Sequence, residues 1–109
     1  MHTRRTIDVT CPECRGPLSE VVENGVVEYR CLVEHRYSPI SVLAAHSETE
    51  ERALWTAALA LEEASVLARE VATHLPESAS RLIAQGEEKN KQSAEIRNLL
   101  QRLKPFTLE

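Results

Sequence analysis

The sequence predicts a small α+β protein, with a β-hairpin module over residues 1–46 and an antiparallel helical hairpin over residues 47–109. All three cysteines and the turn dipeptide Asn24-Gly25 fall in the first part. Residues 48–74 contain no glycine or proline and are rich in alanine, leucine and glutamate, which favours helix. Pro76 then divides the second part into helices over about residues 48–75 and 77–104.

Short strands are expected in the first part. Residues 7–10 can form one strand, and residues 18–23 and 26–31 flank Asn24-Gly25, the strongest short signal for a β-hairpin. In the second hairpin strand Val27, Tyr29 and Cys31 share one face. Arg4 and Arg5 are expected to form a disordered basic tip.

The cysteines and one histidine follow a metal-ligand spacing. Cys11-Pro-Glu-Cys14 is followed, after sixteen residues, by Cys31-Leu-Val-Glu-His35. Zinc prefers four nitrogen or sulfur donors in a tetrahedron, and two short chelate loops can supply them. Pro12 fixes one φ and Gly16 tolerates a positive φ, and both suit a tight knuckle. We therefore predict a structural zinc site, in a zinc-ribbon-like module, formed by Cys11, Cys14, Cys31 and His35.

Several alternatives to this site stay open. A disulfide between Cys11 and Cys14 would leave Cys31 free, and His46 or His2 could replace His35 as the fourth ligand. A redox CxxC would need a thioredoxin-like βαβ context, which the sequence lacks. Glu13 and Glu34 lie beside ligands and are expected to point to solvent. A module this small needs a further source of stability, and structural zinc supplies about 10 kcal/mol or more in small fingers.

The helical part shows two apolar stripes. Ser38-Pro39 predicts a helix start, and Ser47-Glu-Thr-Glu50 resembles a capping box, so a second helix begins or one helix bends there. The apolar face of the last helix is interrupted in its middle by small or polar residues, Gly86, Asn90 and Ser93. The first stripe is expected to face the second helix through Leu54, Leu61, Ala68 and Leu75, against Leu82, Ile83, Ile96 and Leu100.

The second stripe consists of Trp55, Leu59 and Val66, and a surface other than the second helix is needed to bury it. A homodimer paired through the helices as a four-helix bundle would bury it, whereas a monomer could bury Trp55 under its own ribbon. Glu62-Glu63 is read as a solvated helix face.

Composition narrows the function. No apolar run could span a bilayer and no signal peptide is evident, so we expect a cytoplasmic protein with reduced thiols. A net charge of −4, only four aromatic residues, and five arginines against six acidic residues in residues 1–46 disfavour nucleic-acid binding. No serine stands in a nucleophile-elbow context, so no hydrolytic activity is expected.

Three segments carry a family resemblance. They are Cys11-Pro-Glu-Cys-Arg-Gly-Pro-Leu, Tyr29-Arg-Cys-Leu-Val-Glu-His-Arg-Tyr-Ser-Pro and Ala53-Leu-Trp-Thr-Ala-Ala-Leu-Ala-Leu-Glu-Glu. Together they resemble the C-terminal extension of some bacterial chemotaxis protein-glutamate methylesterases, without the receiver or catalytic domains of that family. Glu34 departs from the glycine expected before the histidine, where a left-handed backbone would be costly for glutamate.

The resemblance implies paired ligand roles for Cys11, Cys14, Cys31 and His35 and a packing role for Trp55. It also implies an accessory part in bacterial chemotaxis-type signalling. We therefore expect a non-enzymatic zinc-binding protein-interaction module, with a nucleic-acid-associated zinc-ribbon protein as the alternative.

Overall fold

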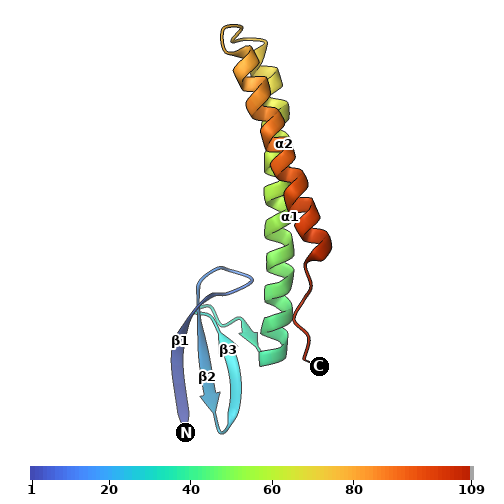
Figure 1. The fold of residues 1–109 in the computed structure, drawn as a ribbon. Helices are drawn as coiled ribbons and strands as arrows, with labels where there is room; N and C mark the ends of the chain where they lie inside the picture. The colour runs from blue at the N-terminus through green and yellow to red at the C-terminus, as the bar shows by residue number, and fades with distance from the viewer. Residues whose placement is uncertain (109) are drawn as a thin grey trace. The chain divides into compact units, whose positions relative to one another are not determined.

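The computed structural model describes residues 1–108 and confirms the α+β class (Figure 1). The elements follow in the order β1 (His2–Thr10), β2 (Pro17–Glu23), β3 (Val26–Arg30), β4 (Arg36–Tyr37), α1 (Pro39–Ala72) and α2 (Ala79–Arg102). The chain divides into two compact units. Unit 1 comprises Met1–Thr49 and the C-terminal segment from Pro105, and unit 2 comprises Glu50–Lys104.

The strands of unit 1 form one antiparallel sheet in the order β1-β2-β3-β4, so each strand pairs with the next in the chain. The first strand is longer than the sequence suggested, because it begins at His2. Arg4 and Arg5, predicted to be disordered, lie in β1 opposite Val21 and Glu20. Backbone pairing and an ion pair of 3.5 Å between Arg5 and Glu20 account for this order.

The predicted hairpin turn at Asn24-Gly25 is confirmed. Both residues have positive φ, 52° and 81°, as a type I′ turn requires. The turn joins β2 to β3 with Glu23 opposite Val26. It therefore sends the chain back to the end of the sheet where β1 finishes, and this end carries the cysteines.

A small core lies beside those cysteines. Leu18 and Tyr37 are buried with Cys11 and Cys31, and partly buried Ile7, Tyr29, Val42 and Ala45 pack against them. Val42 and Ala45 come from the first turns of α1, whereas Ile40 in the same turns is 65% exposed.

Helix α1 begins at Pro39, at the helix start that Ser38-Pro39 predicts. Ser38 caps it: the Ser41 N–H donates to Ser38 Oγ over 3.0 Å, and the Ser38 N–H donates to Ser41 Oγ over 2.8 Å. This reciprocal pair is a capping box in which serine takes the place of the usual glutamate. The helix then continues without interruption through residues 47–50, where the Thr49 hydroxyl donates to the Ala45 carbonyl over 3.1 Å.

In unit 2 the two helices meet through small side chains. The buried positions are Ala58, Ser65 and Ala72 on α1 and Gly86 and Ser93 on α2. A Cβ added to Gly86 would lie 3.1 Å from the Ala68 Cβ. The predicted leucine stripe therefore sits at the margin of this contact: Leu54 and Leu61 are half-buried and Leu75 is 50% exposed.

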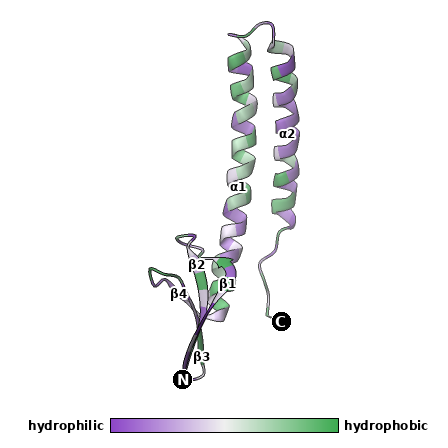
Figure 2. Cartoon of the chain, turned by 90° about the vertical axis from the view of Figure 1, so that its left-hand side faces the viewer, coloured by the Kyte–Doolittle hydropathy of each residue, from purple (hydrophilic) through white to green (hydrophobic). Residues whose placement is uncertain are grey.

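The second apolar stripe stays open to solvent. Trp55 is 46% exposed, Leu59 54% and Val66 52%, so the packing of unit 2 does not cover them. Figure 2 shows the corresponding contrast in hydropathy, with apolar bands along α1 and a mostly hydrophilic α2.

Glu62, expected to be solvated, instead joins the two helices. Its carboxylate accepts hydrogen bonds from Arg97 at 2.6 and 3.0 Å and from the Ser93 hydroxyl. The Arg97 guanidinium lies 5.0 Å from the centre of the Trp55 ring, a cation–π distance.

Candidate metal centre

The four predicted ligands stand on two turns at one end of the sheet. Cys11 and Cys14 lie in the loop between β1 and β2, and Cys31 and His35 lie in the loop between β3 and β4. The strands around these loops pair directly, with Thr10 opposite Pro17 and Arg30 opposite Arg36. Each loop is therefore a closed knuckle held at its base by the sheet.

The two knuckles share one backbone plan. The Cys11 N–H donates to the Gly16 carbonyl over 2.7 Å, and the Arg15 N–H donates back to the Cys11 carbonyl over 2.8 Å. In the second knuckle the Cys31 N–H donates to the His35 carbonyl and the Glu34 N–H to the Cys31 carbonyl, both over 3.2 Å. The first cysteine of each loop thus makes two backbone hydrogen bonds, one through its N–H and one through its carbonyl, and together they close the loop.

Each knuckle also holds one residue in the left-handed region. Arg15 has φ 64° and Glu34 has φ 67°. The positive φ of the first knuckle, expected at Gly16, belongs to its neighbour Arg15. Glu34 adopts the conformation that favours glycine, which is the position where the resemblance led us to expect one.

The donor atoms converge. One ligand atom from each of Cys11, Cys14, Cys31 and His35 lies within 4.8 Å of the others, and this group could hold a metal ion. His35 Nδ1 lies 3.3 Å from Cys31 Sγ and 3.6 Å from Cys11 Sγ. In a zinc tetrahedron a sulfur–nitrogen edge measures about 3.5 Å, so these separations fit such a site.

The three cysteines are free thiols in the structure, so the alternative disulfide is not formed. Cys11 and Cys31 are buried, whereas Cys14 is exposed and His35 is half-buried. The site therefore lies at the edge of the unit 1 core, with one side facing solvent.

Hydrogen bonding favours thiolate at the two buried cysteines. Burial raises the pKa of the Cys11 thiol, but the N–H groups of Cys14 and Glu13, with Tyr37 and His35, lower that pKa to about 6. Burial likewise raises the pKa of Cys31, and the N–H groups of His35 and Val33 reverse the effect, so its pKa is lowered. Metal ligation requires deprotonated sulfur, so these donors prepare the site for a cation.

The pKa values of the two other ligands, Cys14 and His35, are raised rather than lowered. The Gly16 N–H lowers the pKa of Cys14, but burial and the nearby Cys31 and Cys11 thiols outweigh it, so its pKa is raised. Contact with Cys11 raises the pKa of His35, against the effect of burial.

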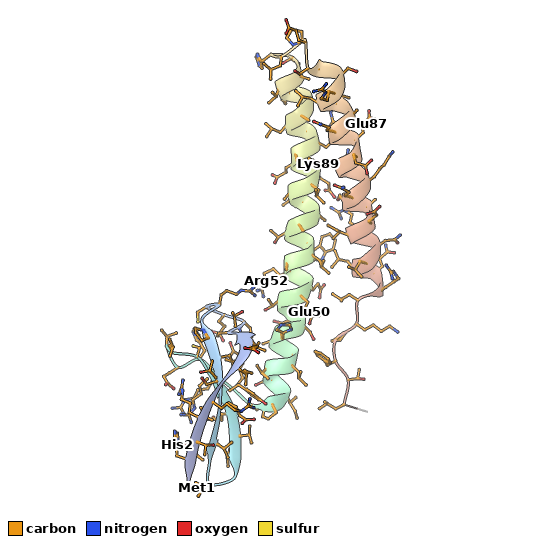
Figure 3. All side chains as sticks on the ribbon, turned by 60° about the vertical axis from the view of Figure 1, so that its left-hand side comes forward. Met1, His2, Glu50, Arg52, Glu87 and Lys89 are labelled. Carbon is orange, nitrogen blue, oxygen red and sulfur yellow. The ribbon has the colours of Figure 1, made fainter. Side chains whose placement is uncertain are left out.

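The alternative histidines lie elsewhere. His2 is at the opposite end of β1 from Cys11, where its Nδ1 lies 2.9 Å from the Glu23 carboxylate (Figure 3). His46 lines an apolar pocket of unit 1 with Ile7, Leu18 and Val42. Within residues 1–108, His35 is the histidine that joins the cysteines.

Glu13 and Tyr37 have contacts at the site that the sequence did not predict. Glu13, expected to point to solvent, places one carboxylate oxygen 3.2 Å from His35 Nε2 and accepts a hydrogen bond of 2.7 Å from the Tyr37 hydroxyl. Tyr37 also lies 3.7 Å from Cys11 Sγ, and burial together with Glu13 raises its pKa. For Tyr37 the only sequence signal was its place two residues after His35, and Glu13 gave none beyond its place beside Cys14.

No family model, curated protein or solved structure matches this chain. Within residues 1–108, neither helix has the length and apolar character needed to cross a bilayer.

Proposed function

We propose that this protein is a non-enzymatic zinc-binding protein-interaction module, in which zinc stabilises unit 1 and the helices of unit 2 provide a contact surface. The observation that carries the proposal is the convergence of three sulfur donors and one imidazole nitrogen within 4.8 Å. The thiolate-rich donor set favours zinc among divalent cations.

A structural role fits this donor set better than a catalytic one. Catalytic zinc keeps a coordination position for water, with three protein ligands. Here Cys11, Cys14, Cys31 and His35 would occupy all four positions. The chain's contribution is then to hold the ligands and to exclude water from the buried cysteines, and the ion supplies cross-linking between the two knuckles.

Metal content tests this function. The purified chain is expected to contain about one zinc ion per molecule by elemental analysis. Cys31→Ser is expected to lose the ion and the sheet, because a buried site without one thiolate loses most of its binding energy. Ser19→Ala, a buried change at a residue of β2 that is not a ligand, is the control for a general loss of folding. Full metal content in Cys31→Ser would contradict the assignment.

The contact surface is the exposed stripe of α1. Three large apolar side chains, Trp55, Leu59 and Val66, are each about half exposed, and Leu67 beside them is 62% exposed. An apolar strip of this kind favours association. A second copy using the same strip would bury it twice in a symmetric homodimer.

Light scattering over a dilution series tests self-association. The wild-type chain is expected to be dimeric and Leu59→Asp monomeric, with the helical circular dichroism of both unchanged. Leu99→Asp is the matched control, because Leu99 is an exposed leucine on α2, at 38% exposure, outside the stripe. A monomeric wild type at high micromolar concentration would exclude the dimer.

The nucleic-acid alternative gains no support from Arg30 and Arg36 of unit 1. Arg30 pairs with Glu28 and Glu23, and Arg36 lies 3.8 Å from Glu34. Paired guanidinium groups offer little free charge to phosphate. We therefore keep the protein-interaction role.

The signalling context is proposed on the sequence resemblance alone. An accessory role in bacterial chemotaxis-type signalling predicts that the zinc-loaded chain binds a purified chemotaxis methylesterase or receptor from the same cell. Binding that is lost in Cys31→Ser would support this role, and the absence of binding to either would contradict it.

A further inference from the structure

We infer that His35 binds the metal through Nδ1 and that Glu13 is the positioning residue that holds the ring for this by accepting the Nε2 hydrogen. The inference rests on the proposed zinc function and adds a specific ligand atom and a residue outside the ligand set. It is carried by the contacts on the two sides of the His35 ring.

The two ring nitrogens face different partners. Nδ1 points at the sulfur atoms, 3.3 Å from Cys31 and 3.6 Å from Cys11, whereas Nε2 lies 3.2 Å from a carboxylate oxygen of Glu13. A neutral imidazole carries one hydrogen, on one of its two nitrogens. With that hydrogen on Nε2 and donated to Glu13, the Nδ1 lone pair is left for the ion.

The backbone explains why the nearer nitrogen faces the centre. The His35 N–H donates to Cys31 Sγ over 3.3 Å, so the main chain of His35 already lies against the site. Nδ1 is the ring nitrogen closer to the main chain. The left-handed Glu34, with φ 67°, produces this tight approach.

Glu13 is itself held in place. Its second carboxylate oxygen accepts a hydrogen bond of 2.7 Å from the hydroxyl of Tyr37, a residue of the buried core that is 8% exposed. Glu13 lies in the first knuckle and His35 in the second. The carboxylate therefore links the two knuckles outside the donor set, in the manner of the carboxylate–histidine pairs that orient zinc ligands.

Glu34 provides a matched comparison. It is an acidic knuckle residue next to His35 in sequence, but its carboxylate lies 4.0 Å from Arg4 and 3.8 Å from Arg36. Removing its charge changes the local electrostatics without removing a partner of His35. Comparing variants of the two glutamates therefore distinguishes the loss of a specific hydrogen bond from a general effect of charge.

The binding atom can be read directly. The full chain, labelled with ¹⁵N-histidine and loaded with zinc, is examined by long-range ¹H–¹⁵N correlation. For His35 we expect a metal-bound Nδ1 and a protonated Nε2. Zinc bound through Nε2 would overturn this inference and leave the proposed function intact, whereas a chain that takes up no zinc would overturn both.

Zinc affinity, measured by competition with a chromophoric chelator, tests the role of Glu13. Glu13→Ala is expected to weaken zinc binding by about 10- to 100-fold, the usual effect of removing such a partner. Glu13→Gln keeps an acceptor oxygen and should recover most of the loss with the same Nδ1 signature. Glu34→Gln should bind as the wild type does. Wild-type affinity in Glu13→Ala would overturn the role of Glu13. So would a loss of affinity in Glu13→Gln and in Glu34→Gln that is as large as the loss in Glu13→Ala.

Discussion

At the scale of single residues, Arg15 and Glu34 occupy equivalent places in the two knuckles. Each donates its N–H to the carbonyl of the cysteine that opens its loop, and each has a left-handed backbone. Such a conformation costs a non-glycine residue about 1–2 kcal/mol, so it persists only where the surroundings determine it. Here the two backbone hydrogen bonds that close each loop determine this conformation.

Glycine at position 34 should therefore stabilise the zinc-loaded protein. Glu34→Gly removes the left-handed strain but adds the backbone entropy of glycine, so we expect a net gain of about 0.5–1 kcal/mol in the free energy of unfolding. Thermal unfolding of the zinc-loaded protein measures it.

The control is Val33→Gly in the same loop. Val33 is exposed and does not have a positive φ, so glycine there relieves no strain and is expected to destabilise the protein. Equal losses in both variants would contradict a strained Glu34.

At the scale of elements, the helical hairpin is specified by its smallest side chains. Ala58, Ser65 and Ala72 on α1, like Gly86 and Ser93 on α2, are spaced seven residues apart and buried. The seven-residue spacing of Leu54, Leu61 and Leu75 predicts bulky side chains in this contact. Small residues instead let the two backbones approach, which moves the leucines to the margin.

Gly86 is the critical position of this contact. Gly86→Leu cannot fit beside Ala68 and the Ser65 backbone, where even a Cβ would meet atoms at 3.1 and 3.3 Å. We expect a loss of about 1–3 kcal/mol in the free energy of unfolding, measured by chemical denaturation. Gln85→Leu, an exposed change on the same helix, should alter stability by no more than about 0.5 kcal/mol. A neutral Gly86→Leu would show that the helices do not meet there.

The Glu62 network makes the hairpin sensitive to acid. The hydrogen bonds of Arg97 and Ser93 lower the pKa of Glu62 to about 2. A lowered folded-state pKa means that the carboxylate stabilises the fold above its ordinary pKa of about 4.3, and that this contribution is lost as pH falls towards 2. Thermal unfolding between pH 5 and about pH 2 should therefore show a decline that is weaker in Glu62→Gln.

The neighbouring Glu63 provides the control. Glu63→Gln removes the same charge one residue along α1, at an exposed position. It should follow the wild-type pH curve. If Glu62→Gln and Glu63→Gln behave alike, the Arg97–Glu62 pair does not contribute to acid sensitivity.

At the scale of the whole molecule, the sequence predicted those features that depend on local chemistry. Metal-ligand spacing identified Cys11, Cys14, Cys31 and His35, and Asn24-Gly25 identified the turn that brings the two knuckles to one end. The contacts of Glu13 and of Glu62 could not be predicted, because they join residues 24 and 35 positions apart. Such pairs depend on packing that periodicity does not encode.

The two compact units also have different sources of stability. Unit 1 buries few large side chains, with Leu18 and Val21 the largest fully enclosed apolar ones besides cysteine. A core of that size favours dependence on a metal, whose binding supplies about 10–16 kcal/mol in small zinc domains. Unit 2 relies on helix propensity and the small-residue contact, and none of the four donors lies in it.

Removing the metal should therefore unfold one unit and spare the other. With excess chelator, we expect the amide hydrogens of β1, β2 and β3 to exchange rapidly while those of α2 keep their protection. The helical circular dichroism should fall only slightly, because Glu50–Lys104 contains most of α1 and all of α2. Added zinc should restore the strand protection, and Cys31→Ser should resemble the chelated wild type with or without zinc. Loss of protection in α2 together with the strands would show that the chain folds as a single cooperative unit and that zinc stabilises all of it.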